Sequence, residues 1–354
     1  MEIFLVFIIP ISIAVFSFIF MKGISFKEFM VHIIAQSFLC GIFLLILYIN
    51  SINFMEIWNG KIVKKYSERV SCEHSYRCHC YTSCSGSGSK RSCTEHCSTC
   101  YDHSYDVDWV AEDNTFEKVR IHRVDRQGLR EPERFSKIEI GEATSHSHTY
   151  RNYLKASKTS IYNEKYKNSF KPEDMPKYPN NIFDYYKLDR LIDSDYTVDV
   201  KYHWQFMQMN GDFGKYECNA ILILTKNKPQ EYAEAVSTFW GGGNKNDAIL
   251  IINMNDLDEI TWVQVYSLTE NSLFQVSLRD DILLLKKFDI DKILDKFSSN
   301  IKNHYKRMEM KNFEYLKYNL SPSMLEIIIL MILGIATSIG LAIFFNINNT
   351  FGDE

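Results

Sequence analysis

The chain has 354 residues, and 46% of them are apolar, which is enough for one or two domains with hydrophobic cores. The formal net charge of -4 is small, so it gives no reason to expect a nucleic-acid partner. The 15 glycines and 7 prolines argue against a fibrous or low-complexity protein.

Three uncharged apolar runs at the two ends of the chain predict membrane-spanning helices. Residues 3–21, 29–55 and 327–352 carry no formal charge. Each run is long enough to cross a hydrocarbon core of about 30 Å as a helix. A cleaved signal peptide is the alternative for the first run, but no basic residue precedes it and a second run follows at once. We therefore predict two transmembrane helices within residues 1–55 and one at 323–347, with the lipid bilayer as a partner.

The charges beside these runs predict the topology. Three spans place residues 56–321 and the C-terminus on opposite sides of the membrane. The loop between the first two runs carries Lys22 and Lys27 against Glu28, which favours a cytoplasmic loop. Basic residues such as Lys61 follow the second run and favour the opposite orientation, but charges beside a long domain are a weaker guide. The cysteine cluster described next decides between the two orientations, and we predict that residues 56–321 lie outside the cytoplasm.

Residues 56–108 form a cysteine-rich segment. Seven of the nine cysteines fall between positions 72 and 100. Disulfides need no fixed spacing, and they suit a short Ser- and Gly-rich segment that cannot build a core. Because seven is an odd number, Cys218 is the candidate for an eighth partner. The cysteines predicted to form structural disulfides are Cys72, Cys78, Cys80, Cys84, Cys93, Cys97, Cys100 and Cys218.

Zinc binding is the alternative for the same cysteines. A tetrahedral zinc site needs four ligands, usually supplied as two short knuckles. Cys78 and Cys80 form one pair, and Cys97 and Cys100 form another, of which only the second has the common two-residue spacing. No cofactor is expected if these thiols are oxidised, and zinc is expected if they are not. A redox role for the thiols is a third alternative.

Residues 109–195 are predicted to form a β-rich region followed by an irregular connector. Apolar and polar side chains alternate at residues 119–121 and again at 137–140, which is typical of strands. A longer alternation covers residues 196–206, with aromatic and β-branched side chains on one face and polar side chains on the other. This stretch is predicted to be a half-buried strand.

Residues 196–320 are predicted to form an α/β domain with helices packed on a sheet. Two short, almost wholly apolar runs have the composition of strands covered on both faces. A helical apolar period marks the long helix that follows them. Besides the strand at 196–206, the expected elements are strands at residues 220–225, 248–254 and 260–268 and helices at residues 229–240 and 289–308.

The glycine-rich turn from Gly241 to Asp247 lies between a helix and a strand. A phosphate-binding loop has the opposite order, from strand to helix, so this turn is predicted to be a helix cap instead. With the helix ending at Trp240, the strand at 248–253 and the run Leu278-Arg279-Asp280-Asp281, it resembles the TPM domain family. These are membrane-associated modules of the thylakoid lumen, the bacterial envelope and some animal membrane proteins. The family's turn usually has Asn-Gly where this chain has Asn246-Asp247.

The resemblance covers about residues 220–305 and implies a candidate site. Acid phosphatase activity has been attributed to some TPM domains, and carboxylates on a loop bind divalent cations. The candidate residues are Gly241, Gly243, Asp247, Asp280 and Asp281. The segments 104–109 and 123–128 resemble uncharacterised membrane proteins of large tailed phages. That resemblance implies a host or bacterial inner membrane and no known chemistry.

The sequence thus predicts a membrane-anchored α+β protein with three transmembrane helices, a small cysteine-rich β segment and a TPM-like α/β domain. The predicted function is a multi-pass extracytoplasmic module that binds a membrane or envelope protein. The alternatives are a TPM-like phosphatase or other hydrolase, and a cytoplasmic-facing zinc-binding interaction module. A binding module is favoured over an enzyme, because the chain has no nucleophile elbow, His-Glu-x-x-His helix or dinucleotide fingerprint.

Overall fold

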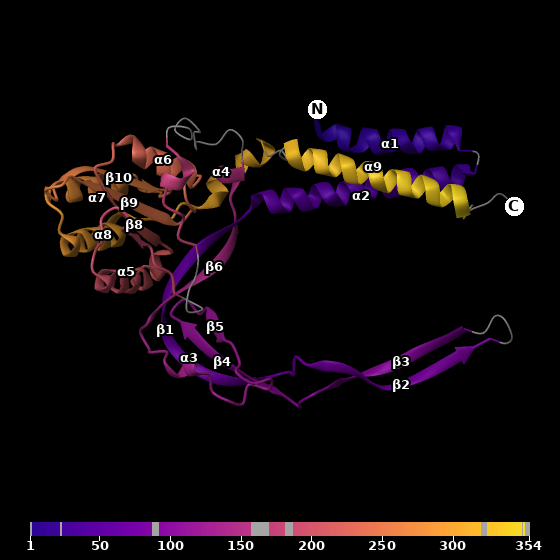
Figure 1. The fold of residues 1–354 in the computed structure, drawn as a ribbon, viewed down its shortest axis with the longest axis horizontal. Helices are drawn as coiled ribbons and strands as arrows, with labels where there is room; N and C mark the ends of the chain where they lie inside the picture. The colour runs from indigo at the N-terminus through magenta and orange to yellow at the C-terminus, as the bar shows by residue number, and fades with distance from the viewer. Residues whose placement is uncertain are drawn as a thin grey trace. The chain divides into compact units, whose positions relative to one another are not determined.

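The computed structural model describes residues 2–21, 23–86, 92–156, 170–180, 187–319, 324–348 and 350. It is a mixed α+β protein, as predicted (Figure 1). The chain divides into two compact units. The helical unit comprises Met1–Met55, Thr149–Asn163 and Glu309–Glu354, and the sheet unit comprises Glu56–His148 and Glu164–Met308.

Three long helices pack against one another in the helical unit: α1 (Glu2–Phe20), α2 (Phe26–Ile52) and α9 (Met324–Asn348). Two short elements, α4 (Tyr153–Ala156) and η4 (Met310–Asn319), also belong to this unit. A capping box starts α2, because Ser25 N donates to Glu28 Oε2 and Glu28 N donates to Ser25 Oγ.

Two described helices, α2 and α9, are long and apolar enough to cross a membrane. Of the three predicted membrane-spanning helices, two are therefore long and apolar enough among the described residues. The first apolar run does form a helix, α1, but its apolar part with described side chains, Val6–Phe20, is shorter than a full span. An α-helix rises about 1.5 Å per residue, so those 15 residues extend over about 22 Å.

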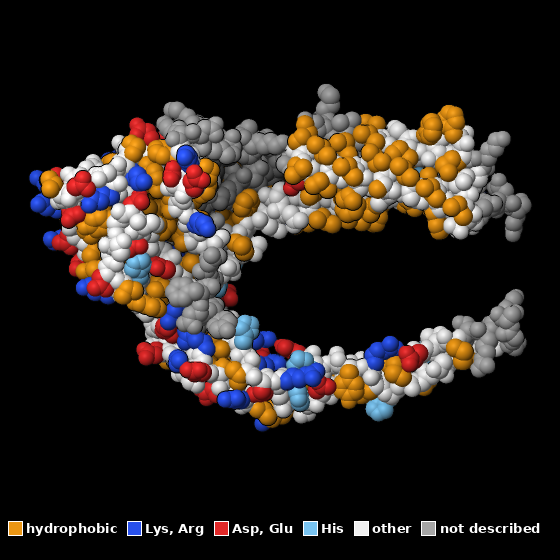
Figure 2. Space-filling view, viewed as in Figure 1, with side chains coloured by type: hydrophobic (Ala, Val, Ile, Leu, Met, Phe, Trp, Pro, Cys, Tyr) orange, Lys and Arg blue, Asp and Glu red, His pale blue; other side chains and the backbone are white. Residues whose placement is uncertain are grey.

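The helical unit has an apolar exterior, and polar as well as apolar side chains are buried in its interior. Large apolar side chains such as Phe38 and Ile347 are about 70% exposed, and Figure 2 shows apolar side chains over the visible face of these helices. In the described parts of α1, α2 and α9, the buried polar side chains are Ser17, Glu28, His32, Gln36 and Ser338. An exterior this apolar is the reverse of that expected for a helix bundle in water.

Hydrogen bonds of the buried polar side chains join the three helices. His32 Nε2 lies 3.1 Å from Ser338 Oγ, and Ser338 Oγ donates to Pro10 O at 2.8 Å. Gln36 Nε2 donates to Gly334 O at 3.1 Å. A Cβ atom at Gly334 would lie only 2.8 Å from the Pro10 ring, so the absence of a side chain lets α1 and α9 approach closely.

One four-stranded sheet of the sheet unit has the order β5-β4-β1-β6. Its strands are β1 (Asn53–Val70), β4 (Asp106–Asp113), β5 (Lys118–Ile121) and β6 (Ala143–Arg151). The strand predicted around residues 119–121 is therefore confirmed as β5. The strand predicted at 137–140 is wrong, because helix α3 (Glu133–Ser136) ends there in a turn that buries Ile138 and exposes Ile140.

The second four-stranded sheet has the order β10-β9-β8-β7. Strands β8 (Asn219–Lys226) and β9 (Asp247–Met254) are parallel neighbours, which confirms their prediction as adjacent buried strands. The short β7 (Leu191–Ile192) continues the parallel part, and β10 (Ile260–Ser267) pairs antiparallel with β9.

Helices cover both faces of this second sheet, and separate apolar clusters fill the two sides. That cover explains why the side chains of β8 and β9 are almost all buried. The helical elements are η2 (Pro172–Asp174), α5 (Val200–Asp212), η3 (Gly214–Tyr216), α6 (Glu231–Phe239), α7 (Leu273–Leu283) and α8 (Ile290–His304). Helices α6 and α8 confirm the predictions at 229–240 and 289–308.

The predicted strand at residues 196–206 is wrong, because most of it belongs to helix α5. Asp199 caps this helix by accepting a hydrogen bond from Lys201 N at 2.9 Å. Asn210 then ties the helix to β8, because its amide group exchanges hydrogen bonds with the backbone of Ala220. Trp204, which a strand would have buried, is 48% exposed. Capping and tertiary contacts therefore outweigh the two-residue alternation.

Candidate functional site

Strands β2 (Ser75–Ser85) and β3 (Ser92–Tyr101) form an antiparallel hairpin that is a sheet of its own. Every side chain of β2 except Cys78 is exposed, and Tyr76 and Tyr81 expose more than half of their surface. A two-stranded hairpin without a packed face is marginally stable in water. Some other interaction must therefore hold these strands together.

Three disulfides supply that interaction. The bonded pairs are Cys78–Cys100, Cys80–Cys97 and Cys84–Cys93. They cross-link β2 to β3 along the length of the hairpin, with sequence separations of 22, 17 and 9 residues. Closing such loops restricts the unfolded chain, so cross-links can replace a missing core. The structure thus supports the predicted disulfides for six cysteines.

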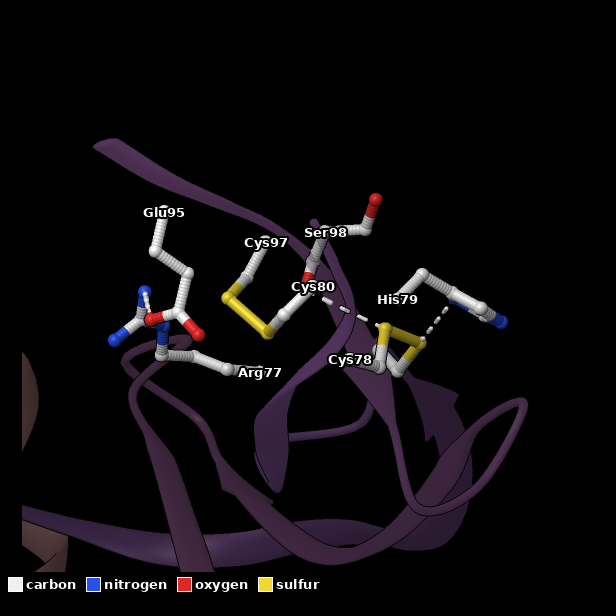
Figure 3. The surroundings of a disulfide bond; sticks show 8 residues. Arg77, Cys78, His79, Cys80, Glu95, Cys97 and Ser98 are labelled. Atoms are coloured by element: carbon white, nitrogen blue, oxygen red, sulfur yellow. Dashed lines mark hydrogen bonds and ion pairs between the residues drawn. A yellow bond between two sulfur atoms is a disulfide. The ribbon is translucent and has the colours of Figure 1, made fainter. Parts of the chain in front are cut away.

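A β-bulge at His79 distributes the disulfides over both faces of the hairpin. The strand register shifts between Cys78 and Tyr81, and His79 has a φ of 45°. In a regular strand, Cys78 and Cys80 would share one face. Figure 3 shows instead that the Cys80–Cys97 bond lies on the side of Arg77 and Glu95, while the sulfur of Cys78 lies on the side of His79. Disulfides therefore cross-link the two strands on both faces of the hairpin.

The inclusion of Cys72 and Cys218 among the disulfide cysteines was wrong, because both are buried free thiols. Cys218 precedes β8 and packs in the core of the second sheet, where burial raises the pKa of its thiol well above the ordinary value. Cys72 lies beside His103, at 3.7 Å from its Nδ1. In the described part of the chain, neither has a cysteine partner.

The predicted zinc site of Cys78, Cys80, Cys97 and Cys100 does not form in this structure. These four cysteines make two of the disulfides, and a disulfide sulfur offers no thiolate to a metal. Residues three apart on a strand also point to opposite faces, so the side chains of Cys97 and Cys100 diverge.

The glycine-rich turn is a helix cap, as predicted. Gly241, Gly242 and Gly243 have φ values of 57°, 77° and 74°, and they end α6 before β9. The Asp247 carboxylate is buried, and it accepts hydrogen bonds from Asn244 N, Tyr178 Oη and Asn219 Nδ2 at 2.6–2.8 Å. These bonds make Asp247 the support of the turn.

The structure does not bring the other candidate carboxylates to this turn. Asp280 and Asp281 lie within helix α7 and not on a loop. Asp280 accepts a hydrogen bond from Arg279, and Asp281 accepts one from Asn300 Nδ2 at 2.9 Å. The described hydrogen bonds of these two residues include none to Asp247 or its partners, so the five residues form no common site.

A buried arginine between the two larger sheets is a feature that the sequence did not reveal. Arg190 is 1% exposed, and it donates to Asn59 Oδ1 and, at 2.7 Å, to Ser145 Oγ. Burial lowers the pKa of its guanidinium to about 10. Arg190 also lines a cavity of about 410 Å³ with Lys187 and Trp204. These residues lie far apart in the chain, so no local pattern marks the cluster.

Comparisons of the chain with protein-family models, curated proteins and solved structures found no match. The resemblances to the TPM family and to phage membrane proteins therefore stay predictions.

Proposed function

We propose that the protein is a membrane-anchored extracytoplasmic module whose β2–β3 hairpin binds a protein of the membrane or envelope. The hairpin itself is the observation that carries this proposal. It is covalently cross-linked at three points, yet it buries almost none of its side chains. A rigid ribbon that contributes so little to a core is best explained by binding, because it loses little conformational entropy when a partner docks.

The buried polar side chains of the helical unit support the membrane anchor. Polar side chains in membrane helices face the bundle interior, where they hydrogen-bond to other helices. His32, Gln36 and Ser338 do so, while apolar side chains cover the outside. We therefore propose that α1 crosses the membrane together with α2 and α9, which makes the protein multi-pass.

The disulfides support an extracytoplasmic location for the region at 56–321. Disulfides persist in oxidising compartments and are rare in a reducing cytoplasm. Of the two lysines that favoured this topology, Lys22 lies outside the described residues. Labelling with a membrane-impermeant thiol reagent tests the proposal. Phe116→Cys, at a position that is 83% exposed, should react in intact spheroplasts. The matched Thr350→Cys variant should react only after lysis, and the reverse pattern would contradict the proposed topology.

Strand addition is the proposed mode of binding. In the described part of the chain, neither outer edge of the hairpin pairs with another strand. Such edges offer backbone donors and acceptors to an extended segment of another protein. Tyr81 stacks on His96 with ring centroids 5.3 Å apart, which places a preordered aromatic pair beside these edges. Aromatic side chains often dominate the energy of protein interfaces.

A photoreactive amino acid at position 81 tests this mode of binding in cells. We expect a discrete cross-linked protein from position 81, and the same substitution at the exposed Phe116 is the matched control. The adduct from position 81 should weaken when Tyr76 is changed to alanine. Absence of a discrete adduct at position 81, or an equal adduct from position 116, would contradict the proposal.

The alternatives have less support. The hydrolase lacks an assembled site, because Asp247 is enclosed by its own hydrogen bonds and Asp280 and Asp281 lie elsewhere. The cytoplasmic zinc module would require the four cysteines that are paired in disulfides.

A further inference from the structure

Three potential metal ligands meet where the two ends of the hairpin join the first sheet. Cys72 lies three residues before β2, His103 lies two residues after β3, and Asp106 is the first residue of β4. Cys72 Sγ is 3.7 Å from His103 Nδ1, which is 3.3 Å from Asp106 Oδ1. The three ligand atoms all lie within 4.8 Å of one another. Cys72 and Asp106 are buried, while the His103 side chain is 25% exposed.

Hydrogen bonds can satisfy the three groups singly or in pairs, but not as one set. One ring nitrogen carries either one hydrogen or one lone pair. If His103 Nδ1 is protonated, it can donate to Asp106, and the thiol of Cys72 can donate to His74 O at 3.6 Å. If Nδ1 is unprotonated, it can accept from the thiol, but its lone pair then faces the Asp106 carboxylate. A cation between the three atoms satisfies all of them at once.

Two of the three separations between these groups match those of tetrahedral zinc. Bond lengths of about 2.3 Å to sulfur, 2.0–2.1 Å to nitrogen and 2.0–2.2 Å to oxygen imply a nitrogen–oxygen separation of about 3.3–3.5 Å. The same bond lengths imply a sulfur–nitrogen separation of about 3.6 Å. The observed separations of 3.3 and 3.7 Å are therefore close to those of a zinc site before any ion binds.

Neighbouring groups fix the orientation of the Asp106 carboxylate. Its Oδ2 atom accepts hydrogen bonds from Glu73 N at 3.0 Å and from Arg123 Nη1 at 2.9 Å. Both bonds leave Oδ1 directed at His103. Supporting bonds of this kind are usual around the ligands of metal sites. Arg123 is itself held by Asp108, so its positive charge is compensated.

Other cysteine-containing clusters in the described part of the chain do not offer such a site. Cys78 and Cys100 lie near His79, and Cys80 and Cys97 lie near Glu95. All four of these sulfurs are in disulfides, so neither cluster contains a thiol. Cys72 is therefore the one cysteine in these clusters that can ligate a metal in the oxidised protein.

We propose that Cys72, His103 and Asp106 bind one zinc ion. Thiolate, imidazole and carboxylate are ligands that zinc accepts together. On binding, the Cys72 thiol gives its proton to water and a zinc–thiolate bond forms, while water takes the fourth position. The ion would join residue 72 to residues 103–106 and so close the base of the hairpin. It would also protect an unpaired thiol in an oxidising compartment.

Metal titration of the full-length protein in detergent, without reductant and after removal of bound metal by a chelator, tests this site. We expect one zinc per chain, and cobalt in its place should give a thiolate charge-transfer absorption. Cys72→Ser and His103→Gln should weaken zinc binding by at least about 10–100-fold, the range seen when even supporting residues of a site are lost. The matched controls, Cys218→Ser and His74→Gln, should bind as the parent does.

Three results would overturn the proposal. The first is a parent protein that takes up no stoichiometric zinc, which needs no variant to establish. The second is a cobalt complex without the thiolate absorption. The third is an absorption that persists in Cys72→Ser, because the thiolate would then come from another cysteine. The assay needs no binding partner, so its outcome is independent of the proposed function.

Discussion

Removal of the middle disulfide should loosen the hairpin by an amount that follows from its nested cross-links. Cys80 and Cys97 are 17 residues apart, and the inner pair, Cys84 and Cys93, already closes 9 of these residues. About 8 residues thus remain for the middle bond to restrict. In the chain-entropy model, a loop of that size corresponds to about 2.5 kcal/mol. Because the strands have almost no core, this loss should appear as local opening of the hairpin.

Hydrogen exchange at the backbone amides of β2 and β3 measures that opening. A loss of about 2.5 kcal/mol predicts exchange up to about 60-fold faster in the Cys80→Ala/Cys97→Ala variant. The matched control is Thr82→Ala/Glu95→Ala, because Thr82 and Glu95 are paired between the two disulfides without a covalent bond. Equal exchange in the two variants, or no change in the first, would refute the role given to the disulfides.

Two further predictions concern the sheet unit. Ile251→Asp should bury an unpaired charge in the central strand β9 and destabilise the second sheet by several kcal/mol. The control variant Leu257→Asp, at a position that is 72% exposed, should not be destabilised in this way. Equal protease resistance of the two variants would show that β9 is not central. Burial lowers the pKa of His146 below its ordinary value of 6.5, so the unfolded chain binds this proton at a higher pH than the folded chain does. The contribution of uncharged His146 to the free energy of unfolding should therefore be complete above about pH 6.5 and decrease as the pH falls below that value. The His146→Gln variant should show a weaker dependence of the melting temperature on pH. An unchanged pH dependence in this variant would show that His146 is not its cause.

The sequence predicted best those strands that are buried on both faces of the sheet. Residues 220–225 and 248–254 are almost uniformly apolar because helices cover both faces of their sheet, and they are adjacent strands as predicted. Residues 196–206 were misassigned because the two-residue alternation does not reflect burial in the helix, where Phe206 is buried but Trp204 is 48% exposed. Asp199, which caps α5, was the local signal for the helix.

Features set by long-range pairing were beyond the sequence. The bulge at His79 depends on which residues of β3 lie opposite β2, and it decides which cysteines meet. His103 and Asp106, which lie beside Cys72, come more than 30 positions later in the chain and are brought there by the return of the hairpin. Arg190 likewise meets Asn59 only because two sheets pack together. Cysteine spacing showed that cross-links were needed but left the pairing open.

A count of free thiols shows whether six of the nine cysteines form the three disulfides of the hairpin. Membranes are denatured without reductant in the presence of an alkylating reagent, and the mass of the intact chain is then measured. Three of the nine cysteines should be alkylated, namely Cys40, Cys72 and Cys218, and the other six should react only after reduction. Nine reactive thiols before reduction would contradict the account, because the hairpin would lose its cross-links and the region at 56–321 its main reason for lying outside the cytoplasm.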